Sequence, residues 1–192
     1  MNPPKFRLVS VTLAICLLFT GCATLARHKH APKTLPPPPS KPQTYWRGDG
    51  VTGEPAILVS ISAQRAYFYK GDALVGESPI SSGRKGFDTP PGSYKVIQKD
   101  KNHVSNLYGE YVDETGTVVK ANVDVTKEPA PEGATFQGAK MPYFLRFTGG
   151  YGLHAGMLPG HRASHGCIRL PHEMARHFFE SAAIGMSVTV QD

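Results

Sequence analysis

Cysteine is scarce in this sequence of 192 residues, with three in all, and charged residues make up only 19% of the chain. Long apolar runs are missing as well. None reaches the roughly 20 residues that a helix needs to cross a bilayer, which excludes a polytopic membrane protein. Hydrophobic residues still make up 40%, so a core can form and global disorder is excluded. Glycine (20) and proline (17) are abundant, and they favour turns and hence many short strands over long helices.

The N-terminus has the pattern of an export signal. A basic start precedes an apolar stretch at 8–19, and two small residues come directly before Cys22. This ending resembles a bacterial lipobox, in which the cysteine is lipidated and becomes the mature N-terminus. We therefore expect a lipoprotein signal peptide at 1–21 and a lipid anchor on Cys22, with ordinary cleavage or an uncleaved anchor as the alternative. Ala23 stands where aspartate would signal inner-membrane retention, so the resemblance implies an outer-membrane protein facing the periplasm.

Export leaves a single thiol for chemistry. Cys16 is removed with the signal and Cys22 carries the lipid, so Cys167 has no other cysteine in the chain to pair with. It is therefore either a buried, inert side chain or a reactive one. Processing also lowers the formal net charge from +6 to +4, because it removes Lys5 and Arg7 and no acidic residue. This small excess suits an anionic cell-wall polymer or a membrane surface, and no motif indicates a nucleic-acid partner.

The rest of the chain divides into a linker and one folded domain. Residues 22–50 are rich in proline, as in an extended spacer, and residues 51–192 form the domain. One helix is expected between Pro171 and Gly185, with Met174, Phe178 and Ala182 on its packed face. The sequence thus predicts a mainly β domain with one helix near the C-terminus. Strands are expected at 56–62, 65–70, 74–80, 93–98, 143–147, 151–154 and 187–190, with a two-residue turn at 63–64, a hairpin around 113–117 and a long irregular loop over 122–140.

Residues suited to covalent chemistry gather around Cys167. A cysteine thiol has a pKa near ~8.5 and becomes a strong nucleophile when a histidine takes its proton. His165 lies two residues earlier, on the same face of an extended chain, and His154 ends a separate predicted strand that can pair beside it. Gly166 gives a carbonyl group room to approach, and the backbone N–H groups around it can stabilise an oxyanion. Arg169 is suited to a substrate carboxylate or to ordering the loop.

The run Ser164-His165-Gly166-Cys167, with His154 upstream, resembles the signature of the L,D-transpeptidase catalytic domain, also called the YkuD-like domain. The resemblance covers roughly residues 56–190 and is supported by Ser82-Gly83, by the turn Thr89-Pro90-Pro91-Gly92-Ser93-Tyr94 and by Met141-Pro142-Tyr143. It implies a β-sandwich-like fold. It also implies an enzyme that cuts the bond after a diamino acid in a peptidoglycan tetrapeptide, forms an acyl-enzyme on cysteine and passes the acyl group to an acceptor amine.

The resemblance assigns roles to individual residues. Cys167 is the nucleophile, His154 accepts its proton and is oriented by the Ala155 carbonyl, and His165 assists or shapes the acyl pocket. Which of the two histidines is the principal base stays open. No cofactor or metal is implied, and the expected partners are peptidoglycan, the membrane through the lipid anchor, and an acceptor protein. The candidate substrate-binding residues are Tyr151, Ala155, Ser164 and Arg169.

Three questions stay open at this point: which acceptor takes the acyl group, whether the chain is an enzyme, and whether the histidines and Cys167 bind zinc instead. The acceptor decides whether the product is a cross-link, a protein attached to the wall or, with water, a carboxypeptidase product. The chain is alternatively a non-catalytic lipoprotein that tethers the membrane to peptidoglycan. A zinc site built from His161, His165, Cys167 and His172 is disfavoured, because the spacing matches no standard ligand pattern and zinc would quench the thiolate.

Overall fold

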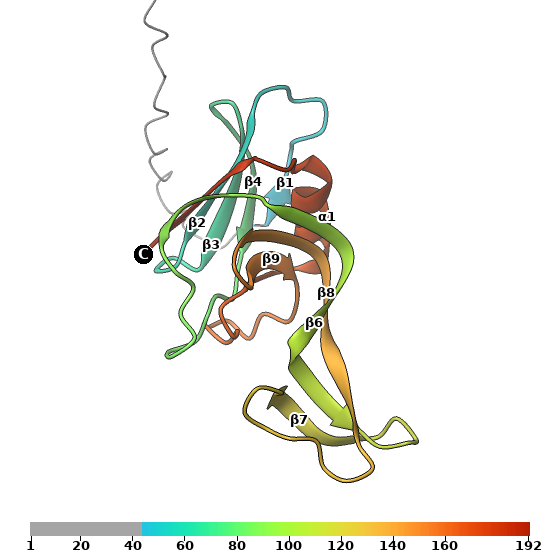
Figure 1. Ribbon diagram of the computed structural model, residues 1–192. Coiled ribbons are helices and arrows are strands. Elements are labelled where there is room, and N and C mark those ends of the chain that lie inside the picture. The colour runs from blue at the N-terminus through green and yellow to red at the C-terminus, as the bar shows by residue number, and fades with distance from the viewer. Residues whose placement is uncertain (1–43) are drawn as a thin grey trace, which may run out of the picture. The chain divides into compact units, whose positions relative to one another are not determined.

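The computed structural model describes residues 44–192, which form two β-sheets and a single α-helix (Figure 1). The expected mainly β fold with one helix is confirmed. The predicted signal peptide, the predicted lipidation site at Cys22 and most of the predicted linker lie outside the described residues. No helix within residues 44–192 is long and apolar enough to span a membrane.

The first sheet has six strands in the order β1-β4-β3-β2-β11-β5. Neighbouring strands are antiparallel except β2 and β11, which are parallel. Ile57 and Val59 lie two residues apart in β2 and point to the main core, whereas Leu58 between them packs in a smaller cluster on the other face, as the period of two in a strand requires. The strands are β1 (Tyr45–Trp46), β2 (Pro55–Ser60), β3 (Arg65–Lys70), β4 (Ala73–Pro79), β5 (Gly92–Lys95) and β11 (Ser187–Gln191).

The second sheet has five strands in the order β10-β9-β8-β6-β7. The outer halves of β6 and β8, together with β7, extend beyond the rest of the domain as an arm (Figure 1). β9 and β10 are parallel, which places Arg169 beside His154. Single bridges from Ser81 to Arg169 and from Gly83 to Ser164 join the chain after β4 to this edge. The strands are β6 (Gln98–Val112), β7 (Val118–Asp124), β8 (Thr135–Thr148), β9 (Tyr151–Ala155) and β10 (Ile168–Leu170).

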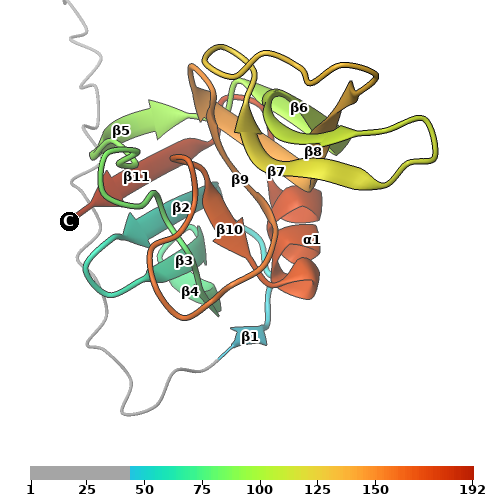
Figure 2. The ribbon, with the colours of Figure 1, turned by 90° about the horizontal axis from the view of Figure 1, so that it is seen from below.

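The helix α1 (His172–Ser181) follows β10 and packs against β8 and β9 (Figure 2). The expected packed face is confirmed, because Met174, Phe178 and Ala182 are all buried in the main core. The helix ends at Ser181, earlier than the expected stop at Gly185. The helix thus packs in one core with Leu153 of β9, and His154, the next residue of that strand, points to the opposite face.

The strand β1 lies ahead of the domain start expected at residue 51, yet it pairs with β4. Its Trp46 packs on the main core. The indole meets the ring of Phe68 edge-on at 5.3 Å between centroids and stacks on His177 of α1 at 5.0 Å. The segment just before residue 51 therefore contributes to the fold.

The irregular loop expected over 122–140 is confirmed only for its middle part, 125–134, and is wrong at both ends. β7 continues to Asp124, and the segment from Thr135 to Lys140 is the first part of β8. Most residues of the arm are exposed or half-buried on both faces, so the sequence shows no alternation of apolar and polar residues there. Two smaller corrections are that the strand expected at 93–98 is split between β5 and β6, and that the turn expected at 63–64 occupies 61–64.

Candidate active site

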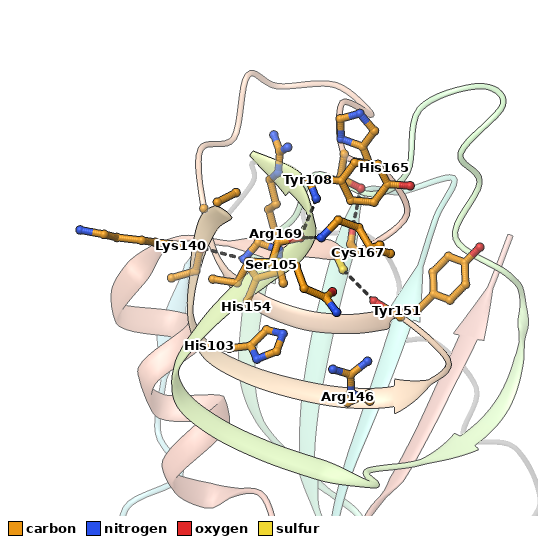
Figure 3. A pocket seen from close by; sticks show the side chains of 18 of the residues that line it. His103, Ser105, Tyr108, Lys140, Arg146, Tyr151, His154, His165, Cys167 and Arg169 are labelled. Carbon is orange, nitrogen blue, oxygen red and sulfur yellow. Dashed lines mark hydrogen bonds between the residues drawn. The ribbon is translucent and has the colours of Figure 1, made fainter. Parts of the chain in front are cut away.

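Cys167 lies one residue before β10, at the end of the loop that follows β9 (Figure 3). Its Sγ lies 3.5 Å from the carbonyl oxygen of Gly150, to which the thiol donates. Burial raises the pKa of the thiol above its usual value, while the Gly152 N–H and the charges of Arg146 and Arg169 oppose the rise. The thiol is therefore protonated at neutral pH, and it needs a base to become a nucleophile.

His154, the fourth residue of β9, is buried and its tautomer is fixed. Its Nδ1 lies 2.8 Å from the carbonyl oxygen of Ala155. A carbonyl oxygen only accepts, so Nδ1 carries the proton and Nε2 is the basic nitrogen. Burial lowers the pKa of His154 to about 4, and the charges of Arg169 and His103 act in the same direction. The ring is therefore neutral, and the orientation through Ala155 is the one that the resemblance implies.

His165 is held by three residues from two other segments of the chain. Its Nε2 lies 2.8 Å from a guanidinium nitrogen of Arg84, which only donates, so this nitrogen already accepts a hydrogen bond. The ring stacks on Tyr108 at 4.3 Å and meets Phe87 edge-on at 4.9 Å. Burial lowers the pKa of His165, and the charge of Arg84 adds to this effect. These contacts suit a residue that shapes the pocket better than one that takes the thiol proton.

Ser164 and Gly166 build the loop that presents the cysteine. The Ser164 hydroxyl donates to the Cys167 carbonyl and accepts the Gly166 N–H at 3.0 Å. Gly166 has a φ of +114°, and a Cβ on it would lie 2.5 Å from the ring of Tyr151. Glycine is thus required here for both conformation and space. Because the Gly166 N–H is used inside the loop, we expect the neighbouring Cys167 N–H to be the donor that stabilises an oxyanion.

Arg169 faces the same site from β10. The aliphatic part of its side chain packs on Gly156, where a Cβ would approach the Arg169 Cγ to 3.0 Å. No carboxylate in residues 44–192 forms an ion pair with its guanidinium, and burial lowers its pKa. A half-buried cation without an anionic partner is suited to an incoming carboxylate.

A cavity of about 510 Å³ joins these residues. A second hollow of about 420 Å³ beside it shares six lining residues with the first, namely Tyr108, Asn122, Ala139, Lys140, His165 and Arg169. Within residues 44–192, no three His, Cys, Asp or Glu side chains are grouped as metal ligands would be. Of the residues expected at the site, all but Gly166 line the cavity, namely Tyr151, His154, Ala155, Ser164, His165, Cys167 and Arg169.

The structure adds residues to the site that the sequence did not indicate. His103 and Tyr108 come from β6, and Lys140 and Arg146 come from β8. Arg84 reaches His165 from the loop after β4. No local pattern marks these residues. His103, Tyr108, Lys140 and Arg146 reach the cavity through the pairing of β6 with β8 and of β8 with β9, whereas Arg84 reaches His165 next to the bridge between Gly83 and Ser164.

Together, a protonated thiol and a neutral imidazole that line one cavity at the edge of a β-sheet define a site suited to acyl transfer through cysteine. The family follows from the sequence. A sequence profile described as YkuD, the L,D-transpeptidase catalytic domain, matches residues 54–190, so the chain belongs to this family. The resemblance seen in the Ser164–Cys167 motif is thereby confirmed.

Named relatives agree with this assignment. The "Probable L,D-transpeptidase YbiS" of Escherichia coli K12 is 28% identical over 143 residues, which cover 71% of this chain and 44% of the relative. The "Probable L,D-transpeptidase 3" of Mycobacterium tuberculosis is 30% identical over 146 residues, which cover 75% of this chain and 48% of the relative. The chain thus spans about half the length of the curated relatives it matches.

Solved structures share the fold. The crystal structure of L,D-transpeptidase 3 from Mycobacterium tuberculosis in complex with a faropenem-derived adduct is 26% identical and has a TM-score of 0.54, covering 72% of this chain and 61% of that one. An L,D-transpeptidase from Mycobacterium smegmatis has a TM-score of 0.55 at 20% identity, covering 72% of this chain and 59% of that one. The family fold expected from the sequence is therefore confirmed.

Proposed function

We propose that this chain is a cell-wall L,D-transpeptidase that acts on peptidoglycan tetrapeptide stems through an acyl-enzyme on Cys167. The observation that carries the proposal is the tautomer of His154, whose Nδ1–H is committed to Ala155 so that its basic Nε2 serves the cavity shared with the thiol. A thiol with a raised pKa requires such a base.

Acylation begins when the scissile carbonyl of the donor stem enters the cavity. The proton of Cys167 Sγ moves to His154 Nε2 as the sulfur bonds to the carbonyl carbon. The peptide C–N bond then breaks, and His154 returns the proton to the leaving amine. The Cys167 N–H stabilises the oxyanion of the intermediate. Both side chains end this half-reaction neutral, which agrees with the low pKa of His154.

The cations around the cavity are suited to bind a peptide substrate that carries several carboxylates. Arg146, Arg169 and Lys140 all line it. Arg146 is held in place by Gln98 at 2.6 Å and by the Gly149 carbonyl at 2.6 Å, so its position is fixed before substrate arrives. Preorganised cations bind carboxylates without further loss of side-chain entropy. We assign Arg169 and Arg146 to the donor stem, with Tyr151, Ala155 and Ser164 in the cavity wall.

The acceptor half-reaction needs room for a second molecule. The two adjoining hollows, which share a wall at His165 and Arg169, give donor and acceptor separate places. This arrangement favours transfer to an amine of a second stem or of a protein over hydrolysis. His165, fixed by Arg84 and Tyr108, shapes the wall between the two hollows.

The proposal includes the cellular context predicted from the sequence. Residues 1–21 form the signal peptide, Cys22 carries the lipid, 22–50 form the linker and 51–192 form the catalytic domain. The domain then works in the periplasm at the end of a tether on the outer membrane. A Cys22→Ala variant that keeps its electrophoretic mobility and membrane association would refute the anchor.

The enzymology is tested with purified protein and a disaccharide tetrapeptide. Intact-mass analysis is expected to detect the donor minus its terminal residue as a thioester on Cys167, and peptide products to include a cross-linked dimer. Cys167→Ala abolishes both, and His154→Gln slows acylation by about 10²–10⁴-fold. His172→Gln, an exposed histidine on α1, is the matched control and leaves the rate unchanged. Full turnover by Cys167→Ala refutes the mechanism.

The products also separate the alternatives. A tripeptide without a dimer identifies a carboxypeptidase. Binding to isolated peptidoglycan that is unaffected by Cys167→Ala, without any adduct, identifies a tether. Because faropenem forms an adduct with the related Mycobacterium tuberculosis enzyme, we also expect penem and carbapenem compounds to acylate Cys167 here.

A further inference from the structure

A third histidine lines the active-site cavity and has no part in the acylation chemistry above. His103 lies in β6, opposite Met141 of β8, and its side chain is 18% exposed. Figure 3 draws its ring on the same side of the second sheet as Arg146, His154 and Cys167. A partly exposed imidazole inside a reaction cavity is available for contact with substrate.

Two contacts fix the His103 ring. Its Nδ1 lies 3.0 Å from a carboxylate oxygen of Asp100 in the same strand. A carboxylate only accepts, so Nδ1 carries the proton and Nε2 is the basic nitrogen, as in His154. The ring face stacks on Phe144 at 4.3 Å between centroids and 11° between planes. An aspartate in this position orients the imidazole and stabilises the imidazolium that forms when Nε2 takes a proton.

Phe144 joins His103 to the acylation machinery. Its side chain is fully buried, and its ring lies 4.3 Å from that of His103 and 6.3 Å from that of His154. The two imidazoles therefore stand on one aromatic support, contributed by the strand between theirs. The charge of His103 adds to burial in lowering the pKa of His154, so the two rings are electrostatically coupled.

The acceptor step needs a base that His154 is poorly suited to provide alone. A lysine-type amine has a pKa near ~10.4 and arrives as an ammonium ion, which is not nucleophilic. His154 is the group that returns a proton to Sγ when the thioester is cleaved, so the first proton of the ammonium needs another acceptor. The Nδ1–H of His103 donates to the carboxylate of Asp100, whereas that of His154 donates to a backbone carbonyl.

We propose that His103, oriented by Asp100, is a second acid–base residue of this site, which deprotonates the acceptor amine before it attacks the acyl-enzyme. The inference rests on the proposed function, because it requires a thioester on Cys167. The ammonium gives one proton to His103 Nε2, and His103 then releases this proton to water. The free amine attacks the thioester carbonyl, the C–N bond forms and the C–S bond breaks. The second amine proton passes through His154 to Sγ, which restores the thiol.

The test measures acylation and aminolysis separately. The acyl-enzyme is formed with the disaccharide tetrapeptide and followed by intact mass, and Nα-acetyl-lysine is then added at neutral pH. His103→Gln is expected to acylate within about twofold of the wild-type rate but to form the lysine amide about 10- to 100-fold more slowly. Asp100→Asn, which keeps the imidazole, is expected to slow formation of the lysine amide less than His103→Gln does. His172→Gln on α1 leaves both steps unchanged.

A second nucleophile distinguishes a base from a structural residue. Hydroxylamine is largely unprotonated at neutral pH and needs no such base, so it should release the acyl group from wild type and His103→Gln at equal rates. Equal slowing with both nucleophiles, or no slowing with either, overturns the assignment. Absence of any thioester in the wild type overturns the proposed function itself. A thermal unfolding midpoint of His103→Gln near that of the wild type, together with its normal acylation, excludes misfolding as the cause.

Discussion

Replacement of Gly166 by alanine tests whether the loop before the cysteine is built as described. The residue has a φ of +114°, which costs a residue with a Cβ about 1–2 kcal/mol. The new Cβ would also lie 2.5 Å from Cε1 and 3.0 Å from Cδ1 of Tyr151, whose ring packs against the main core and resists displacement. Overpacking of this kind costs about 1–3 kcal/mol. We therefore expect Gly166→Ala to lower the free energy of unfolding by about 2–5 kcal/mol.

Equilibrium urea unfolding measures this loss, and the chain offers a matched control. Gly160 has a φ of +87° in the same loop, but a Cβ added to it would meet nothing within 4 Å. Gly160→Ala should therefore cost only the conformational part, about 1–2 kcal/mol. In a Tyr151→Ala background, the cost of Gly166→Ala should fall to that of Gly160→Ala. Equal costs for the two glycine variants in the wild-type background would refute the argument.

Three further predictions concern electrostatics and packing. Burial holds the pKa of His154 at about 4, so between pH ~6.5 and 4 the unfolded chain binds a proton at this residue that the folded chain does not. The free energy of unfolding should therefore fall by about 3 kcal/mol as the pH drops from above 6.5 to 4. Urea unfolding of wild type and His154→Gln at both pH values checks this, and the same fall in the variant would contradict it. Arg84→Gln removes a positive charge 2.8 Å from His165 and should raise the pKa of that ring, as followed by NMR titration; an unchanged pKa would mean that burial alone sets it. Trp46→Ala removes the indole between Phe68 and His177. Because the indole is only half-buried, the free energy of unfolding should fall by about 3 kcal/mol, the low end for such a truncation, and a neutral effect would mean that β1 does not belong to the domain.

Local patterns along the chain were enough for the elements that face the core. β2 and β3 are short, continuous apolar runs that are buried on both faces, and the helix repeats Met174 and Phe178 at the expected spacing. Burial produces such apolar runs in strands and such a spacing in a helix, so both can be recognised without a structure. The arm is different, because β6, β7 and β8 are solvated on both faces over much of their length, and their hydrogen-bond pairing leaves no trace in side-chain type.

By itself the sequence predicted the segment that we propose to be reactive, because His165, Gly166 and Cys167 are neighbours in the chain and their chemistry depends on residue type. It also indicated His154, since a histidine at the end of a strand can reach a cysteine beside it. Only the tertiary structure decided what surrounds them. Arg84 engages His165, and His103 joins His154 on Phe144, through strand pairings that bring distant residues together. The contact of Arg84 depends on the bridge between Gly83 and Ser164. The contacts of Phe144 depend on the register of β6, β8 and β9, which no short motif encodes.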